Sequence, residues 1–275
     1  MKTVKISSKM LVLVSIAFLM VWLFPYLYLI SSAFRPSAEV ISIPPRFFPT
    51  VFSVENFTNL FARMPVMGHI GNSLIAAVAS TVIAVILGSL AAYAISRSGT
   101  KMSVALVVMI LCLRMIPPSS IAVPIFEVII NLGLFDTSLA LIIVYAAINI
   151  PFVMWVMLGF YESIPFTLDE AACVDGAGSF RTFYRIILPI CLPGIATASI
   201  FTLFLAWNDF LMALLLTSVR AKTFTVALAE FLSAYSMDLG PMVAGAFLFS
   251  FPVMLLSMLL QGYIVKGMTA GAVKG

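Results

Sequence analysis

A chain of 275 residues would ordinarily form one or two soluble domains, but hydrophobic residues make up 63% of it and charged residues only 9%. Because a soluble surface needs roughly 25% charged residues, this composition excludes a soluble protein and predicts that lipid is the main solvent. The excess of 15 Lys and Arg over 11 Asp and Glu is unclustered, which fits a membrane topology signal and not nucleic-acid binding. Three scattered cysteines and one histidine fit no metal site, disulfide framework or Ser-His-Asp triad.

Six apolar segments are predicted to cross the membrane as helices, since one span needs about 20 apolar residues. In chain order they cover residues 10–34, 66–95, 102–130, 137–161, 190–216 and 239–265. We therefore predict a single all-α transmembrane domain over residues 1–275, with both termini on one side. The first apolar run is longer than a signal-peptide core and has no clear small-residue cleavage site, so we expect it to persist as a helix.

The lysines and arginines predict the orientation of these six spans. If the N-terminus is inside, the inner segments carry nine of them, namely Lys2, Lys5, Lys9, Arg97, Lys101, Arg181, Arg185, Lys266 and Lys274. The outer segments carry five, namely Arg35, Arg46, Arg63, Arg220 and Lys222. Because positive residues favour the cytoplasmic side, both termini are predicted to be inside.

The two longer outer loops differ in character. Residues 35–63 are rich in proline and phenylalanine, and we expect them to pack as a small cap or to lie at the membrane interface. A plain connector is the alternative for this segment. Residues 220–238 are polar and can hold a short helix.

The inner loop, residues 162–189, is too polar to cross the membrane and too regular to be a slack connector. Thr167 and Glu170 have the spacing of a capping box, which predicts that a short helix begins there. Gly176 and Gly178 are expected to end this helix. The loop suits the docking of a soluble partner on the inner side, and the alternative is an interfacial helix without a partner.

A second short helix is predicted after Ser179, which can cap it. Phe180, Phe183, Tyr184 and Ile187 then recur at helical spacing, so they are expected to form one apolar stripe that faces the membrane protein.

The same loop carries a complete signature. Glu170-Ala171-Ala172 is followed after three residues by Gly176, and nine residues later by Ile186-x-Leu188-Pro189. This is the EAA signature, so the chain resembles the membrane subunits of binding-protein-dependent ABC importers, and in particular the shorter permease of maltose-type carbohydrate importers. Segments 114–118, 207–211 and 267–275 also look like that family, although Asp209 stands where many relatives have Glu.

This resemblance implies a type I ABC importer permease fold with a cytoplasmic coupling helix. It implies that Glu170, Ala171, Ala172, Asp175 and Gly176 couple the chain to an ATPase. It also implies that the tail, residues 266–275, contacts the ATPases through Thr269, Gly271, Lys274 and Gly275. The chain itself has no Gly-rich phosphate loop, so ATP and Mg²⁺ are expected on the partners, and this chain is expected to bind no cofactor and to be no enzyme.

The partners that the resemblance implies are a second permease in a heterodimer, two ATP-binding subunits or a homodimer of one, and an extracytoplasmic solute-binding protein. The expected location is the cytoplasmic membrane of a bacterium or archaeon. The expected solute is a sugar, with a polyol, glycerol phosphate, or an acidic or sulfonated sugar as alternatives. A membrane enzyme lacks a catalytic constellation here, and an independent secondary transporter would be longer, with internal repeats and no EAA loop.

Intramembrane polar residues are the default candidates for the solute pathway. Arg114 and Asn149 fall near mid-membrane, and each precedes prolines, Pro117-Pro118 and Pro151, that are expected to break the helix. Asn208 and Asp209 are expected near the outer edge, at a gate or a binding-protein contact, and Tyr145 can stack on a sugar ring. The alternative is that these groups only pack or hydrogen-bond between helices.

Overall fold

The computed structural model describes residues 8–234 and 238–272, except the side chains of residues 8, 101, 102 and 259–272, and over this range it contains helices and no strand. Four of the described helices are long and apolar enough to cross a membrane, and up to six spans result if each of two bent helix pairs counts as one. The chain is therefore an all-α membrane protein. It divides into a smaller unit, residues 1–66 with 228–251, and a larger unit, residues 67–227 with 252–275.

The smaller unit contains α1 (Ser8–Ala33), a long apolar helix whose side chains are mostly exposed. Residues 35–63 fold into a cap with two short helices, α2 (Ser37–Val40) and α3 (Glu55–Arg63). The Phe34 ring lies 5.1 Å from the ring of Phe52 and 5.0 Å from that of Phe57, and it meets the ring of Phe247 at 5.5 Å. The loop is thus a packed cap and not a plain connector.

Two buried polar side chains hold the end of α1 to this cap. The Arg35 guanidinium donates to the carbonyl oxygens of Arg46 and Phe47 at 2.7 and 3.0 Å. The Asn56 amide donates to the carbonyl oxygens of Ala33 and Arg35 at 3.2 and 2.8 Å. Carbonyls at the end of a helix have no partner within it, and Asn56 supplies one to Ala33, while Arg35 ties the end of α1 to the cap backbone.

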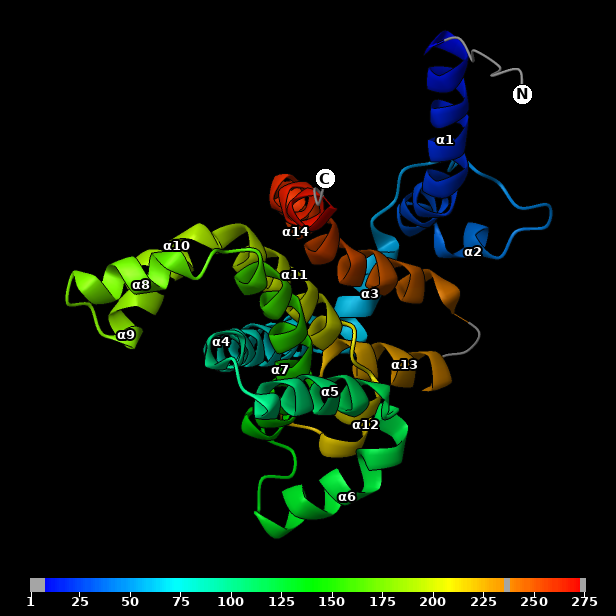
Figure 1. Cartoon of the computed structure of the whole chain (residues 1–275). Coiled ribbons are helices and arrows are strands. Elements are labelled where there is room, and N and C mark those ends of the chain that lie inside the picture. The colour runs from blue at the N-terminus through cyan, green and yellow to red at the C-terminus, as the bar shows by residue number, and fades with distance from the viewer. Residues whose placement is uncertain (1–7, 235–237, 273–275) are drawn as a thin grey trace. The chain divides into compact units, whose positions relative to one another are not determined.

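The larger unit is centred on α7 (Ser138–Glu162), which contacts α5, α11 and α12. Its other helices are most of α4 (Val66–Ser98), α5 (Lys101–Met115), α6 (Pro118–Asn131), α8 (Thr167–Val174), α9 (Ser179–Thr182), the π-helical turn η1 (Phe183–Ile187), α10 (Leu188–Ile190), α11 (Leu192–Trp207) and α12 (Leu211–Leu216). α13 (Phe224–Ala234) and α14 (Leu239–Ala272) each have residues in both units. Figure 1 shows α8, α9 and α10 lying together as an arm, which we call the α8–α10 arm.

Two of the predicted spans are bent in the structure. The segment predicted at 102–130 consists of α5 and α6, which meet at an angle of 93°. The segment predicted at 190–216 ends as α11 at Trp207, resumes as α12 at Leu211, and meets the preceding helix at 80°. Prolines at the start of α6 and α11 explain where these helices begin, because a proline at a first helical position needs no N–H partner.

The prolines do not act alike. Pro117 and Pro118 interrupt the helix between α5 and α6, as predicted. In contrast, α7 continues through Pro151 from Ser138 to Glu162. The predicted break at Pro151 is therefore wrong. A buried helix that is packed on several sides can tolerate one proline, since tertiary contacts hold it in place.

The positions of the last two helices agree in part with those predicted from the sequence. α13 is the short helix expected within residues 220–238. α14 begins at Leu239, as expected for the sixth span, but it continues past residue 265 to Ala272.

Candidate functional site

The α8–α10 arm contains the EAA signature, and its first helix is short and sharply ended. α8 runs from Thr167 to Val174. The N–H of Ala177 donates to the carbonyl of Ala172 at 2.9 Å, and the N–H of Gly176 donates to that of Cys173 at 3.0 Å. This is a Schellman ending, in which Gly176 takes a φ of +77°. A Cβ at Gly176 would meet nothing within 4 Å, so glycine is favoured there by the backbone conformation and not by crowding.

The start of α8 differs from the prediction. The N-cap residue is Phe166, and its side chain makes no capping hydrogen bond, so the Thr167–Glu170 capping box does not form. The N–H groups of Asp169 and Glu170 instead donate to the Phe166 carbonyl. The next helix likewise begins after Gly178 without a side-chain cap from Ser179.

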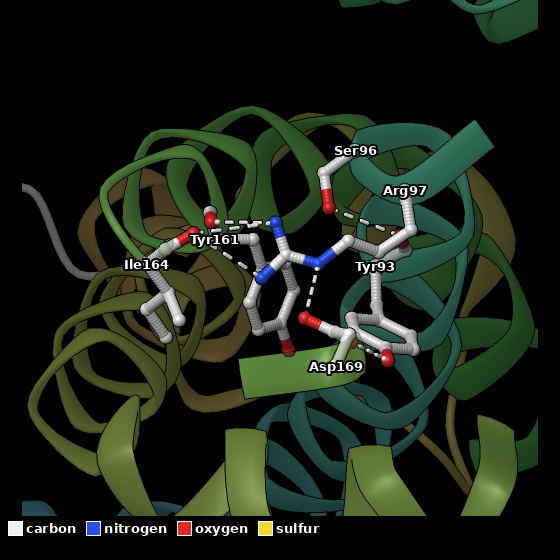
Figure 2. A network of polar contacts seen from close by, with 6 residues as sticks. All are labelled: Tyr93, Ser96, Arg97, Tyr161, Ile164 and Asp169. Atoms are coloured by element: carbon white, nitrogen blue, oxygen red, sulfur yellow. Dashed lines mark hydrogen bonds and ion pairs between the residues drawn. The ribbon is translucent and has the colours of Figure 1, made fainter. Parts of the chain in front are cut away.

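An ion pair fixes α8 to the end of α4. The Arg97 Nε lies 3.0 Å from a carboxylate oxygen of Asp169, and the Tyr93 hydroxyl donates to the other oxygen at 2.5 Å. The Arg97 guanidinium also donates to the carbonyl oxygens of Tyr161 and Ile164, at 3.3 and 3.4 Å, where α7 ends. Figure 2 shows Arg97 between these carbonyls and the Asp169 carboxylate. We call this network the Arg97 seat, and it ties three segments of the chain together.

Three aromatic rings continue the seat into the core. Tyr93, Tyr161 and Phe183 come from α4, α7 and η1, and the ring of Tyr93 lies 5.7 Å from that of Tyr161 and 5.0 Å from that of Phe183. The Tyr161 hydroxyl and the Ser89 hydroxyl are hydrogen-bonded at 2.5 Å in a fully buried position. Because core side chains are close-packed, a displacement of α8 is expected to reach α4 and α7.

The opposite face of α8 is open. Glu170, Ala171 and Asp175 are exposed, and Val174 is 88% exposed. Ala172 lies on the inner face and is buried against this same chain. A groove of about 700 Å³ runs beside the helix, between the seat and the start of α9. An exposed face that combines apolar residues with two acids is suited to a protein partner.

The predicted apolar stripe of the second helix is only half correct. Phe183 and Ile187 are buried, but Phe180 is 73% and Tyr184 63% exposed. Phe183 packs against the rings of Tyr93 and Tyr161, and Ile187 lies in the same buried cluster. Phe180 and Tyr184 therefore add to the exposed surface of the arm.

Three of the predicted pathway residues, Tyr145, Asn149 and Asp209, lie close to one another on α7 and just after α11. Tyr145 is buried, and its hydroxyl interacts electrostatically with the Asp209 carboxylate but has no hydrogen bond of normal geometry. The Asn149 amide donates to the Tyr145 carbonyl at 2.9 Å, one turn earlier in the same helix. Asp209 accepts from the N–H groups of Met212 and Ala213, so it caps α12. These contacts fit the alternative of packing and hydrogen bonding between and within helices.

The other two pathway candidates, Arg114 and Asn208, are exposed, although Asn208 directly precedes Asp209 in the chain. The Arg114 guanidinium carbon lies over the Phe152 ring, 5.1 Å from its centroid, at the end of α5. The Asn208 amide donates to the Phe204 carbonyl at 2.8 Å, where α11 ends. In the tail, Thr269 and Gly271 belong to the helical backbone of α14, and Lys274 and Gly275 lie outside the described residues.

The residues of the Arg97 seat were not among the sequence candidates. Arg97 counted only as a topology charge, and Asp169 stands beside the signature without being part of it. The adjacency of Asp169 to Glu170 was the one available signal. The pairing itself joins positions far apart in the sequence, and local patterns do not predict such contacts.

Comparisons with known proteins bear on the whole chain. A family model described as binding-protein-dependent transport system inner membrane component matches residues 84–270. The chain is 34% identical over 256 residues to the trehalose transport system permease protein SugB of Mycobacterium tuberculosis, covering 92% of this chain and 93% of that protein. It is 32% identical over 270 residues to the trehalose/maltose transport system permease protein MalG of Thermococcus litoralis, covering 97% and 96%.

The fold also matches a solved structure. A crystal structure of a bacterial ABC transporter involved in the import of the acidic polysaccharide alginate contains a chain that aligns with a TM-score of 0.79 and 20% identity. The alignment covers 96% of this chain and 99% of that chain. At this level of identity the likeness establishes the fold.

Proposed function

Because the chain belongs to the family of binding-protein-dependent transport system inner membrane components, we propose that it forms half of the membrane pathway of an ATP-driven sugar importer. It is a multi-pass permease subunit with the type I ABC importer fold, and it is not the subunit that hydrolyses ATP. Trehalose and maltose are the solutes in the names of the two relatives, which supports a sugar as the solute.

One observation carries the proposed mechanism: α8 is anchored inward by the Arg97 seat while Glu170, Ala171 and Val174 face outward. An ATPase subunit that binds the exposed face would pull on α8. The ion pair and the ring cluster would transmit this movement to α4 and α7. In this proposal the carboxylate of Glu170 pairs with a basic residue of the ATPase, Ala171 permits close approach, and Ala172 seats α8 on its own chain.

The proposed assembly follows from the same role. The chain pairs with a second permease, two ATP-binding subunits dock on the inner side, and a solute-binding protein docks on the outer side. ATP and Mg²⁺ belong to the ATP-binding subunits. The lysine and arginine distribution supports termini on the inner side of a bacterial or archaeal cytoplasmic membrane. A screen of sugars, polyols and glycerol phosphate against the solute-binding protein would identify the solute.

Reversal of the Glu170 charge tests the proposed coupling. In the complete importer in proteoliposomes, we expect E170K to reduce ATP-driven uptake on the order of tenfold or more, since like charges would replace a charge-assisted contact at the ATPase. The matched control is E162K, which reverses an exposed acid at the end of α7. Solute affinity of the binding protein should not change. Wild-type uptake by E170K would contradict the coupling role.

The C-terminal tail is included in the proposed ATPase-facing surface. It comprises the last turns of α14 and the residues after Ala272, is expected on the inner side, and is composed mainly of small residues, which allow a backbone to enter a narrow cleft. Deletion of Met268 to Gly275 should weaken co-purification of the ATPase subunits while membrane insertion persists. Normal ATPase association and full uptake after the deletion would show that the tail has no such role.

A further inference from the structure

The segment that follows α12 is held on one side by a single carboxylate. Asp136 lies between α6 and α7, and its carboxylate oxygens accept hydrogen bonds from four consecutive backbone N–H groups, those of residues 218–221, at 2.9 to 3.2 Å. The N–H of Asp136 donates in return to the carbonyl of Leu216 at 3.0 Å. We call this arrangement the Asp136 clamp.

The same segment is held on its other side by α4. The Asn72 amide donates to the carbonyl oxygens of Arg220 and Lys222 at 2.9 and 3.0 Å. The Nδ1 of His69 lies 3.1 Å from the Lys222 carbonyl, and the Ser73 hydroxyl accepts from the N–H of Phe224 at 2.9 Å. Side chains from two separate elements thus satisfy the backbone of one short loop.

Within this fixed backbone, a short tip projects into solvent. Ser218, Val219 and Arg220 are exposed, and Val219 is 75% exposed, whereas Ala221 is buried. Within the described chain, the Arg220 side chain takes part in no hydrogen bond or ion pair. The tip therefore presents one apolar side chain and one cation on a backbone that the clamp holds in place.

The clamp is maintained against a conformational cost. Asp136 has a φ of +59°, a conformation that costs a side-chain-bearing residue about 1–2 kcal/mol. Water could satisfy the N–H groups of an ordinary exposed loop without this strain. Burial alone would raise the pKa of the Asp136 carboxyl, but the backbone hydrogen bonds lower it to about 2. A carboxyl pKa lowered in this way contributes stability that is lost only as pH falls through about 2, so the clamp stays charged at neutral pH.

We propose that Asp136 is a positioning residue, whose carboxylate holds residues 218–221 as a preformed tip that docks the solute-binding protein through Val219 and Arg220. This inference rests on the proposed function and on the orientation that places this loop outside. A preformed loop binds with less loss of conformational freedom than a mobile one. The partner surface would be acidic around an apolar contact, to complement Arg220.

Two variants separate the carboxylate from the backbone conformation of Asp136. Asn and Gly both tolerate a positive φ, so D136N and D136G keep the turn but remove the anion. In the reconstituted importer, ATPase activity is measured against the concentration of solute-loaded binding protein. Both variants should raise the half-saturating concentration about tenfold or more, with a maximal rate close to wild type. E127Q, at an exposed acid on α6, is the charge-matched control and should leave the half-saturating concentration unchanged.

Two further measurements test the rigidity of the tip and the contact made by Arg220 separately. Hydrogen exchange of the peptide that covers residues 217–223 should be slow in the wild-type complex and faster in D136N. R220A leaves the backbone and the clamp in place and should also raise the half-saturating concentration.

The outcomes distinguish this proposal from the proposed function. Unchanged half-saturation in D136N and D136G, or a lower maximal rate alone, would overturn the positioning role, as would loss of association with the second permease as the sole effect. If these variants do not assemble, wild-type half-saturation in R220A overturns it. A wild-type complex that no binding protein stimulates would instead refute the proposed function.

Discussion

Replacement of Asp169 by Ala is expected to abolish most ATP-driven uptake while the ATPase subunits remain able to hydrolyse ATP. The side chains of Arg97 and Asp169 are only 13% and 11% exposed, so D169A would leave the guanidinium without its counter-ion in a nearly buried position. Breaking such a pair costs on the order of 3–5 kcal/mol. We expect α8 itself to be displaced, because the loss of Asp169 also removes the partner of the Tyr93 hydroxyl.

The measurement is the ratio of solute transported to ATP hydrolysed in proteoliposomes. R97A should lower this ratio as D169A does, and the double variant should be no worse than either single one, because the two residues form one unit. Y93F removes only one hydrogen bond to Asp169 and should have a smaller effect. E162Q, at the exposed end of α7, serves as the control for loss of a carboxylate. A wild-type ratio in D169A would show that α8 is held in place without the ion pair.

Replacement of Gly88 by Ala is expected to destabilise the larger unit, although Ala favours helices. A Cβ at Gly88 would lie 2.8 Å from the Cβ of Val153, 2.9 Å from its Cγ1, and 3.2 Å from the carbonyl oxygen of Ile150. Val153 is fully buried, so α4 and α7 would have to move apart. Overpacking of this kind costs typically about 1–3 kcal/mol.

Gly71 lies on the same helix and provides the matched comparison. A Cβ at Gly71 meets nothing within 4 Å, so G71A should gain up to about 1 kcal/mol from helix propensity alone. The two Gly-to-Ala changes on α4 should therefore shift the melting temperature of the purified complex in opposite directions. Equal melting temperatures for G88A and G71A would mean that α4 and α7 do not approach as closely as described.

The long apolar helices could be predicted from the sequence because hydropathy alone reports them, and so could the break at Pro117-Pro118, but the angle of the bends and the continuity of α7 through Pro151 could not. Pro117 follows Ile116, whose ψ of 119° is extended, and Pro118 opens a new helix. The residue before a proline is driven from the helical region, and two prolines in succession impose this twice. Pro151 is single and lies within a helix that is buried on several sides, so packing preserved the helix there. The two sites look alike in the sequence, because the packing around Pro151 depends on residues far away in the chain.

The candidate site, like the fold, could be predicted only in its local features. The EAA spacing identified α8 and its glycine ending, because local backbone rules govern both. It could not show that Ala172 faces inward, or that Arg97 and Asp169 meet, because these features depend on how α4 and α8 come together. The contacts of Asn149 and Asp209 were also out of reach, since counting along a helix gives depth but not hydrogen-bond partners.

The π-helical turn η1 divides the α8–α10 arm into a turn that absorbs an extra residue and regular helix whose length sets the direction of the arm. It closes with the N–H of Leu188 on the carbonyl of Phe183, one residue farther than in an α-helix. Removal of one residue from this turn itself would restore α-helical geometry with little rotation of the flanking segments, because the turn absorbs one extra residue locally. Removal of one residue from the regular helix beside it would instead rotate everything before the change by about 100° relative to α11. The face that carries Glu170 would then point elsewhere, although every one of its side chains was intact. A substitution in the arm alters a contact, whereas a change of one residue in the length of its regular helix turns the whole surface. Divergence outside η1 is therefore expected to proceed by replacement and not by insertion or deletion.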